Sequence, residues 1–164
     1  MAGAQEIEKT KPTILIVEDD KDLLESYKQF FEDNMFDVDC TCTGSEAAEK
    51  IATKDYDLAL IDIVLPDMRG TILLPKFRRT IPTTRKIIIT GYVTLENVVD
   101  AINNGAKFFL SKPVKLDDLL EAANKQLEIR ARELELFQKK FTALKQEHLE
   151  SPKKRRPATG NQNH

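Results

Sequence analysis

Five short apolar runs alternate along this chain with segments whose apolar residues recur at helical spacing. Runs that are apolar and rich in β-branched residues are typical of strands covered on both faces of a sheet. Parallel neighbouring strands need crossover connections, and helices supply them. The alternation therefore predicts an α/β fold, a doubly wound five-stranded parallel sheet with strands near Ile14–Val17, Val38–Cys42, Leu58–Ile61, Ile87–Ile89 and Phe108–Leu110.

The segments between these runs predict the connecting helices. Asp20 can cap the first of them, because an aspartate side chain accepts hydrogen bonds from the first amides of a helix. After the third strand, the apolar residues between Ile72 and Phe77 predict a helix that ends near Pro82. The second strand alternates apolar and polar residues, so we expect a half-exposed strand at an edge of the sheet. Its two cysteines, Cys40 and Cys42, are expected to be small buried residues that neither form a disulfide nor bind zinc.

Polar side chains follow four of the five predicted strands. Glu18 and Asp19 follow the first strand, Asp62 the third, Thr90 the fourth and Lys112 the fifth. The carboxyl ends of parallel strands lie at one edge of the sheet, which is where ligands bind in open α/β sheets. We therefore expect three carboxylates, a hydroxyl and an ammonium group to converge there.

The expected cluster suits phosphoryl transfer. Two carboxylates about 4 Å apart repel each other by roughly 4 kcal/mol at an effective dielectric constant of about 20. A divalent cation would offset that repulsion, and oxygen-only ligands favour Mg²⁺. In this scheme Asp62 is the nucleophile, Asp19 binds Mg²⁺ directly, Glu18 binds it through a water, and Lys112 and Thr90 receive the phosphoryl group. The alternative for Asp62 alone is a solvated residue that caps a turn.

Four segments together resemble the receiver domains of two-component response regulators, in the CheY-like superfamily. They are ILIVED from Ile14, DIVLPDMRG from Asp62, IITGY from Ile88 and GAKFFLSKPV from Gly105. The resemblance covers roughly residues 13–128 and implies a flavodoxin-like sheet with the strand order 2-1-3-4-5. It also implies that a histidine kinase or phosphotransfer protein donates a phosphoryl group to Asp62, so that the protein is a phosphoacceptor in signalling and not an enzyme.

The resemblance assigns further roles. It implies that the backbone carbonyl of Val64 helps to bind Mg²⁺, for which Mn²⁺ can substitute, and that the peptide bond before Pro113 is cis. Thr90 and Phe109 form the implied switch, in which the hydroxyl moves towards the phosphoryl group and the aromatic ring turns inward. Phe108 is expected to be part of the core.

Two departures from the family pattern concern the lifetime of the phosphoryl group. Val64 and Tyr92 occupy positions that border the attacking water, and neither is an acid or an amide. We therefore expect slow loss of phosphate from Asp62. Two rival functions remain open: an adaptor whose receiver is not phosphorylated, and a small Mg²⁺-dependent phosphatase or phosphotransferase. The latter would need a second acid at position 64.

The last helix is expected to extend beyond the receiver domain. No Gly or Pro lies between Val114 and Ser151, so a helix from about Asp117 to Glu150 would be roughly 50 Å long, whereas a compact receiver is about 35 Å across. We expect residues 129–150 to form a coiled-coil-like extension that pairs in parallel with a second copy, giving a homodimer. Folding back on the domain and docking on another protein are the alternatives. The expected heptad seam is Leu116, Leu120, Ala123, Leu127, Arg130, Leu134, Phe137, Phe141, Leu144 and His148.

The two ends of the chain carry no predicted element. Residues 1–12 form a polar lead, and residues 151–164 form a disordered tail with four basic residues and no acid. The tail lacks the helix-turn-helix or aromatic platform of a DNA reader, which argues against DNA binding. No stretch approaches the roughly 18 apolar residues of a membrane span. The N-terminus lacks the apolar core of a secretory signal, which predicts a cytoplasmic protein.

Overall fold

A parallel five-stranded sheet forms the centre of the structure, a computed structural model that describes residues 10–77 and 83–150. The strands lie in the order β2-β1-β3-β4-β5, and each neighbouring pair is parallel. This confirms the predicted α/β fold and the flavodoxin-like strand order. The strands are β1 (Thr13–Val17), β2 (Asp37–Thr41), β3 (Leu58–Ile61), β4 (Arg85–Thr90) and β5 (Phe108–Ser111).

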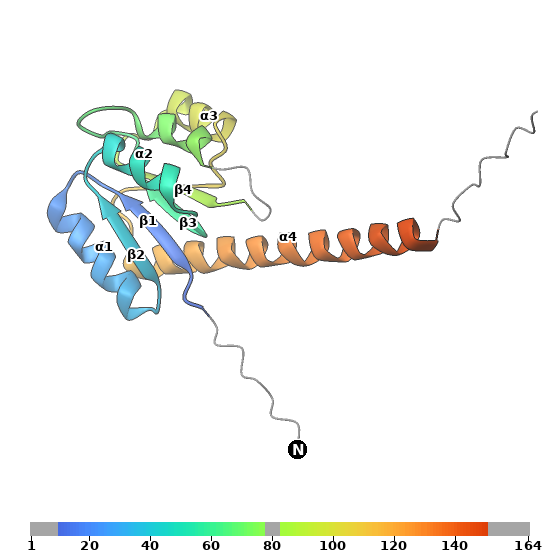
Figure 1. Ribbon diagram of the computed structural model, residues 1–164. Coiled ribbons are helices and arrows are strands. Elements are labelled where there is room, and N and C mark those ends of the chain that lie inside the picture. Colours follow the sequence, from blue (N-terminus) through green and yellow to red (C-terminus); the bar gives the residue numbers. More distant parts are fainter. Residues whose placement is uncertain (1–9, 78–82, 151–164) are drawn as a thin grey trace, which may run out of the picture.

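Helices cover both faces of the sheet (Figure 1). Two helices, α1 (Lys21–Asp33) and α4 (Leu116–Glu150), pack on one face. The other face is covered by α2 (Gly44–Thr53), η1 (Gly70–Lys76) and α3 (Leu95–Asn103). The crossover connections of a parallel sheet account for this two-sided arrangement.

The central strands are buried on both faces, which explains their unbroken apolar sequences. In β1, Ile14 and Ile16 pack towards α1 and α4, whereas Leu15 and Val17 pack towards α2 and η1. Side chains alternate between the two faces of a strand, so a strand with helices packed on both faces of the sheet needs apolar residues at every position.

The connection after β3 differs from the prediction. An α-helix ending near Pro82 was expected, but the structure has a 3-10 helix over Gly70–Lys76 with Pro75 inside it. Pro75 has no N–H to donate, and its ring would crowd the carbonyl four residues earlier in an α-helix. The expected end at Pro82 lies outside the described residues.

The two edge strands are less buried than the central ones. Phe108, at the start of edge strand β5, was expected in the core, but this prediction is wrong: its side chain is 38% exposed. Its neighbour Phe109 is partly buried against the core on the α2, η1 and α3 side. On the opposite edge, Cys40 and Cys42 are half-buried free thiols rather than fully buried residues.

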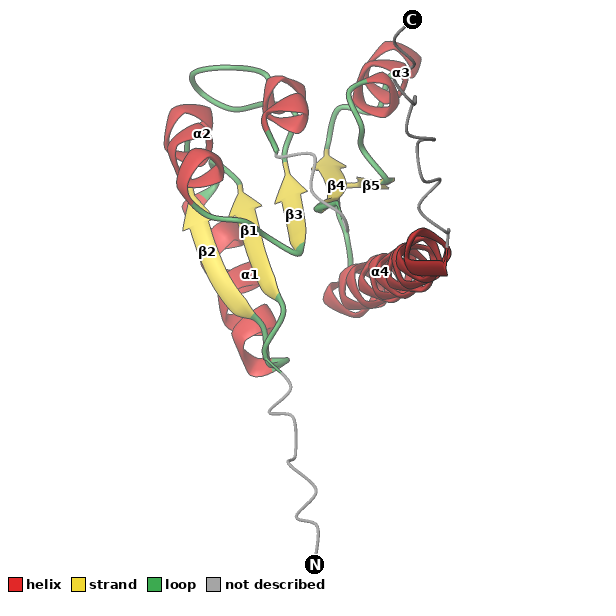
Figure 2. Cartoon of the chain, turned by 45° about the vertical axis from the view of Figure 1, so that its right-hand side comes forward, coloured by secondary structure: helices red, strands yellow, loops and turns green. Residues whose placement is uncertain are grey.

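The first half of α4 docks on the sheet with one face. Leu119, Ala122, Ala123 and Gln126 are buried there. The buried face of this half of α4 is therefore turned about the helix axis relative to the predicted seam, whose members Leu120 and Leu127 are only partly buried. Figure 2 shows α4 close to end-on below β4 and β5, with α3 on the other side of the sheet.

Polar side chains anchor the same face of α4 to the sheet. Arg85 is buried at the start of β4, where its Nε donates to Gln126 Oε1 at 3.1 Å and its guanidinium lies 2.8 Å from Glu133. Arg130 lies 2.7 Å from Asp57, just before β3. Arg130, the charged member of the predicted seam in this half of the helix, thus anchors α4 to the sheet.

Beyond these anchors α4 leaves the domain (Figure 1). Every residue from Glu135 to Leu149 is exposed. The helix has 35 residues, which corresponds to about 52 Å at 1.5 Å per residue, so the predicted projection is confirmed.

Two predicted segments fall outside the described residues. They are the polar lead, of which only residues 10–12 are described, and the basic tail over 151–164. Among the helices of the described part, none combines the length and apolar character needed to cross a membrane.

Candidate functional site

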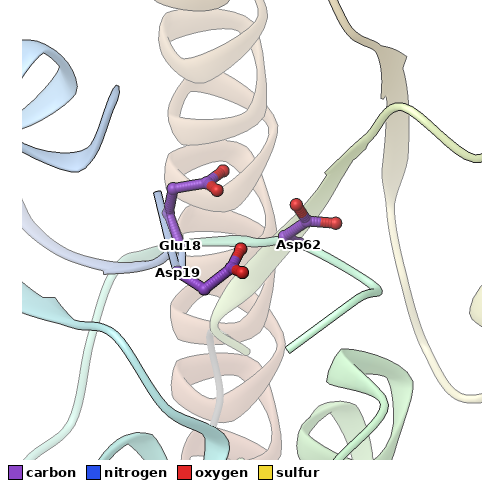
Figure 3. Close-up of side chains that lie close together, drawn as sticks. All are labelled: Glu18, Asp19 and Asp62. Carbon is purple, nitrogen blue, oxygen red and sulfur yellow. The ribbon is translucent and has the colours of Figure 1, made fainter. Parts of the chain in front are cut away.

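Three carboxylates meet at the carboxyl edge of the sheet (Figure 3). Glu18 and Asp19 directly follow β1 and Asp62 directly follows β3, with one oxygen of each lying within 4.8 Å of the others. The pairing of Val17 with Ile61 brings the residues after these strands side by side. Glu18 and Asp62 are buried, whereas Asp19 is exposed.

One ammonium group lies between two of these carboxylates. Lys112 Nζ is 2.6 Å from Asp62 Oδ2 and 2.6 Å from Glu18 Oε2. Lys112 directly follows β5, and its peptide bond to Pro113 is cis. Three carboxylates and one ammonium group leave two negative charges unbalanced when all are ionised. This charge and the all-oxygen donor set fit a divalent cation such as Mg²⁺.

The pKa values at the site reflect burial and pairing. Burial raises the pKa of the Glu18 carboxyl, although the hydrogen bond and charge of Lys112 oppose that effect. Burial by itself would lower the pKa of Lys112, but its hydrogen bonds to Asp62 and Glu18 outweigh it and raise that pKa. Lys112 is therefore charged at neutral pH and holds two acids that would otherwise repel each other.

A hydrogen-bonded chain joins the loop after Asp62 to Thr90, the last residue of β4. The Thr90 hydroxyl, fully buried, accepts from the backbone N–H of Tyr92 at 3.2 Å. Asn97 donates to the Tyr92 carbonyl at 2.9 Å and accepts from Arg69 at 2.6 Å. Sequence reasoning missed Arg69 and Asn97, because no motif or spacing marks two surface polar residues that meet only in the folded chain.

The loop after β3 turns back directly against Asp62. Gly70 donates its N–H to the Ile63 carbonyl at 2.8 Å, and Val64 pairs with Arg69 in an antiparallel bridge. A Cβ on Gly70 would lie 1.9 Å from the Asp62 carbonyl oxygen, so only glycine fits there. The Val64 N–H donates to Asp62 Oδ1 at 3.1 Å and helps to orient the carboxylate.

Asp67 holds the far end of this loop. Its carboxylate accepts from the backbone N–H groups of Gly44 and Ser45, each at 2.8 Å, and from the Ser45 hydroxyl at 2.7 Å. These bonds lower the pKa of Asp67 to about 2, the Ser45 hydroxyl contributing most. Asp67 therefore ties the loop to the start of α2 through these contacts.

Sequence comparison identifies the family. The model for the response regulator receiver domain matches residues 14–124. The alginate biosynthesis transcriptional regulatory protein AlgB of Pseudomonas putida is 32% identical over 117 residues, which are 71% of this chain and 26% of AlgB. The cell cycle response regulator CtrA of Brucella ovis is 31% identical over 107 residues, which are 65% of this chain and 46% of CtrA. The chain thus spans less than half the length of either relative.

Solved structures agree with this result. A CheY-like receiver domain protein from Methanospirillum hungatei JF-1 superposes with a TM-score of 0.72 at 42% identity, covering 75% of this chain and 98% of that one. The signal receiver domain of an HD domain-containing protein from Pseudomonas fluorescens Pf-5 gives a TM-score of 0.69 at 29% identity, covering 75% and 99%. The chain therefore belongs to the response regulator receiver domains, which are signalling proteins rather than conventional enzymes and bind a divalent ion at an acidic pocket.

Proposed function

We propose that Asp62 accepts a phosphoryl group from a histidine kinase or a phosphotransfer protein. The observation that carries this proposal is the 2.6 Å contact between Asp62 and Lys112 inside a cluster of three carboxylates. A carboxylate oxygen is the nucleophile, and the adjacent ammonium group stabilises negative charge on the transferred group. Membership of the receiver family implies a histidine kinase as partner.

The acidic cluster supplies the ligands for a cation. Glu18, Asp19, Asp62 and the backbone carbonyl of Val64 would hold Mg²⁺, for which Mn²⁺ can substitute. When bound, a divalent ion offsets the negative charge of the phosphoryl oxygens. Lys112 provides a second positive charge next to the Asp62 oxygen.

The Thr90 hydroxyl and Phe109 are the proposed switch. Thr90 now accepts a hydrogen bond from the Tyr92 amide. A hydroxyl that donates to a phosphoryl oxygen gains a charge-assisted bond, which favours a rearranged β4–α3 loop. Phe109 lies on β5 opposite Ile88 of β4 and is only partly buried, so an inward turn of its ring would remove more of its apolar surface from water.

Acetyl phosphate and Mg²⁺ test the phosphorylation directly. We expect intact-mass spectrometry to show one stable added phosphoryl group on the wild-type protein and none on Asp62→Asn. Asp67→Asn is the matched control, because it removes another carboxylate of the same loop and should leave the adduct unchanged.

Two other outcomes would replace the proposal with the rival functions. Continuous release of inorganic phosphate without a stable adduct would indicate a Mg²⁺-dependent phosphatase or phosphotransferase. No modification by acetyl phosphate or by any kinase would indicate an adaptor whose receiver is inert.

The exposed part of α4 is the proposed output element. We take residues 13–128 as the receiver and residues 129–150 as its helical extension, through which two copies associate or a partner docks. Three large apolar side chains are exposed along one face of it: Phe137 at 42%, Phe141 at 49% and Leu144 at 63%. The two phenylalanine rings stack with centroids 6.1 Å apart. An apolar stripe of this kind is typical of a helix that pairs with another helix.

Analytical ultracentrifugation tests the association. We expect the wild-type protein to self-associate with increasing concentration and Phe137→Gln/Phe141→Gln to remain a monomer. Leu136→Gln is the control, because Leu136 is 59% exposed on the same helix but lies off the stripe. A wild-type protein that stays monomeric at all concentrations would contradict self-association.

A further inference from the structure

We infer that two copies pair through the exposed ends of α4 in antiparallel orientation, with Phe141 of each copy against Leu144 of the other. We call residues 135–149 the free segment. The inference rests on the proposed homodimer and specifies its geometry. It departs from the parallel arrangement that the heptad pattern by itself favours.

The docked face and the apolar stripe are one continuous face of α4. Phe137 follows Leu119 by 18 residues, which is about five helical turns of 3.6 residues. The same interval relates Phe141 to Ala123, and Leu144 follows Gln126 in the same way. Leu119, Ala123 and Gln126 are buried against the receiver. Each stripe residue therefore points to the side of the helix on which the receiver lies.

This geometry obstructs a parallel pair. In a parallel pair the two seam faces would face each other along the whole helix. Over residues 119–133, however, the seam face of each helix is already packed against the receiver of the same copy. A crossing angle of about 20° moves the axes apart by only about 10 Å over the roughly 27 Å from residue 137 back to residue 119. A receiver about 35 Å across cannot be accommodated in that space.

An antiparallel pair removes the obstruction. The receivers then lie at opposite ends, and only the free segments overlap. With Phe141 opposite Leu144, the overlap ends where Leu149 of one copy is level with Leu136 of the other along the helix axis, on the opposite flank of the stripe. Leu136 is three residues beyond Glu133, the anchor that contacts Arg85. The free segment is therefore as long as the overlap requires.

The charges that flank the stripe favour the same orientation. Lys140 and Glu147 lie on one flank of the stripe, and Lys145 lies on the other, where its Nζ is 4.7 Å from the centroid of the Phe141 ring. In a parallel pair opposite flanks meet, so Lys140 faces Lys145 of the second copy and repels it. In the antiparallel pair like flanks meet, so Lys140 faces Glu147 of the second copy, twice in each dimer. Flanking charges of this kind set the orientation of paired helices.

The charges also select the register. A shift of one heptad in the antiparallel pair would bring Lys140 against Lys140 of the second copy and Glu133 against Glu147. Both contacts are between like charges, which destabilise a helix pair. Only the register with Phe141 opposite Leu144 combines the full apolar overlap with attractive flanks.

Charge reversal distinguishes the two orientations, because its effect has opposite signs in them. In the antiparallel dimer, Lys140→Glu faces Glu147 and should weaken self-association about tenfold at low salt. In a parallel dimer the same change would face Lys145 and strengthen association. Lys140→Glu/Glu147→Lys should restore the wild-type dissociation constant. Gln146→Glu is the control, because residue 146 lies about 180° from Phe137 on the helix.

A distance measurement provides an independent test on the full-length chain. A spin label on Lys125→Cys, in a Cys40→Ser/Cys42→Ser background, reports the separation of the two docked halves. The antiparallel register predicts about 50 Å between the labels along the helix axis, whereas a parallel pair predicts about 10–20 Å. The same label with Phe137→Gln/Phe141→Gln should give no interchain distance.

The outcomes separate this inference from the proposed function. A dimer with the short distance, or one tightened by Lys140→Glu, would overturn the antiparallel orientation and leave the homodimer in place. A wild-type chain that never self-associates would overturn both. The phosphorylation of Asp62 is measured by mass and is independent of either result.

Discussion

The Lys112 ammonium group lies 2.6 Å from the Asp62 carboxylate, across 50 residues of chain. The same nitrogen is 2.6 Å from Glu18, so one cation bridges the ends of β1, β3 and β5. Lys112 thereby fills two roles, since it balances buried acids in the resting protein and stands beside the proposed phosphoryl acceptor.

Replacing Lys112 with Met should make the stability of the protein depend on metal. Without the ammonium group, Glu18 and Asp62 are buried carboxylates with no cation between them. Breaking a buried pair in this way costs about 3 kcal/mol. We expect thermal unfolding in EDTA to occur at a lower temperature than in wild type, and the rise in Tm on adding Mg²⁺ to be larger.

Lys115→Met is the control for this experiment, because Lys115 is exposed three residues further along. If Lys112→Met unfolded at the wild-type temperature in EDTA, the bridging role of Lys112 would be wrong.

Gly70→Ala should destabilise the domain strongly. The added Cβ would meet the Asp62 carbonyl oxygen at 1.9 Å and Ile61 Cγ2 at 2.8 Å, so the β3–η1 loop must shift away from the site. Forced overpacking of this kind costs about 1–3 kcal/mol, or more against rigid backbone. We expect chemical denaturation to show that loss, and phosphorylation by acetyl phosphate to slow with it.

Gly91→Ala is the matched comparison. A Cβ at Gly91 would meet nothing within 4 Å, so this change should be neutral. Equal stability of the two variants would refute the close approach of Gly70 to Asp62.

Val64→Asn should shorten the lifetime of the phosphoryl group. Val64 is 45% exposed and Tyr92 is 65% exposed, and neither offers a carboxylate or an amide to orient an attacking water at Asp62. An amide at position 64 supplies such a group and should speed dephosphorylation by about tenfold. The decay of the phosphorylated species can be followed by intact mass after removal of acetyl phosphate.

Val64→Ala separates water orientation from loss of bulk. It should leave the lifetime near the wild-type value. A lifetime of only seconds in the wild-type protein, unchanged by Val64→Asn, would count against this account.

Asp67 should contribute stability that disappears in acid. Hydrogen bonds from Ser45 and Gly44 lower its pKa to about 2 in the folded protein, below the ordinary aspartate value of 3.8. A depressed folded-state pKa means that the unfolded chain binds the proton more readily, so the stabilisation is complete above about pH 4 and is lost as the pH falls through about 2.

Urea unfolding of wild type and Asp67→Asn between pH 7 and pH 2 measures this effect. Wild type should be the more stable protein at pH 5–7, and the difference should close between about pH 4 and pH 2. A difference that stays constant over this range would show that the charge of Asp67 does not matter.

The sequence determined the sheet and the composition of the site. Apolar strand-like runs that alternate with helical segments favour a parallel sheet, because the helices supply the crossover connections. Parallel strands place the residues after their C-terminal ends at one edge of the sheet. The order of strands and polar residues along the chain therefore places Glu18, Asp19, Asp62, Thr90 and Lys112 in one group. The length of α4 also followed from the sequence, because no Gly or Pro interrupts it.

Other features of the fold arise from contacts between segments distant in sequence. The 3-10 geometry of η1 reflects Pro75, and Gly70 is required because the backbone of Asp62 lies against it. Arg69 and Asn97 become partners only when the loop after β3 meets the start of α3.

The direction in which α4 presents its apolar stripe was decided by tertiary structure. Apolar residues occur around more than one side of its first half, so the sequence was compatible with a seam through Leu120 and Leu127. Arg85 and Asp57, at the opposite edge of the sheet from Asp62, pair with Glu133 and Arg130 and select the face that contains Leu119. Because α4 is one continuous helix, this choice also fixes the direction in which Phe137, Phe141 and Leu144 point. The helical periodicity of the sequence cannot predict that direction, because the direction depends on contacts with the sheet.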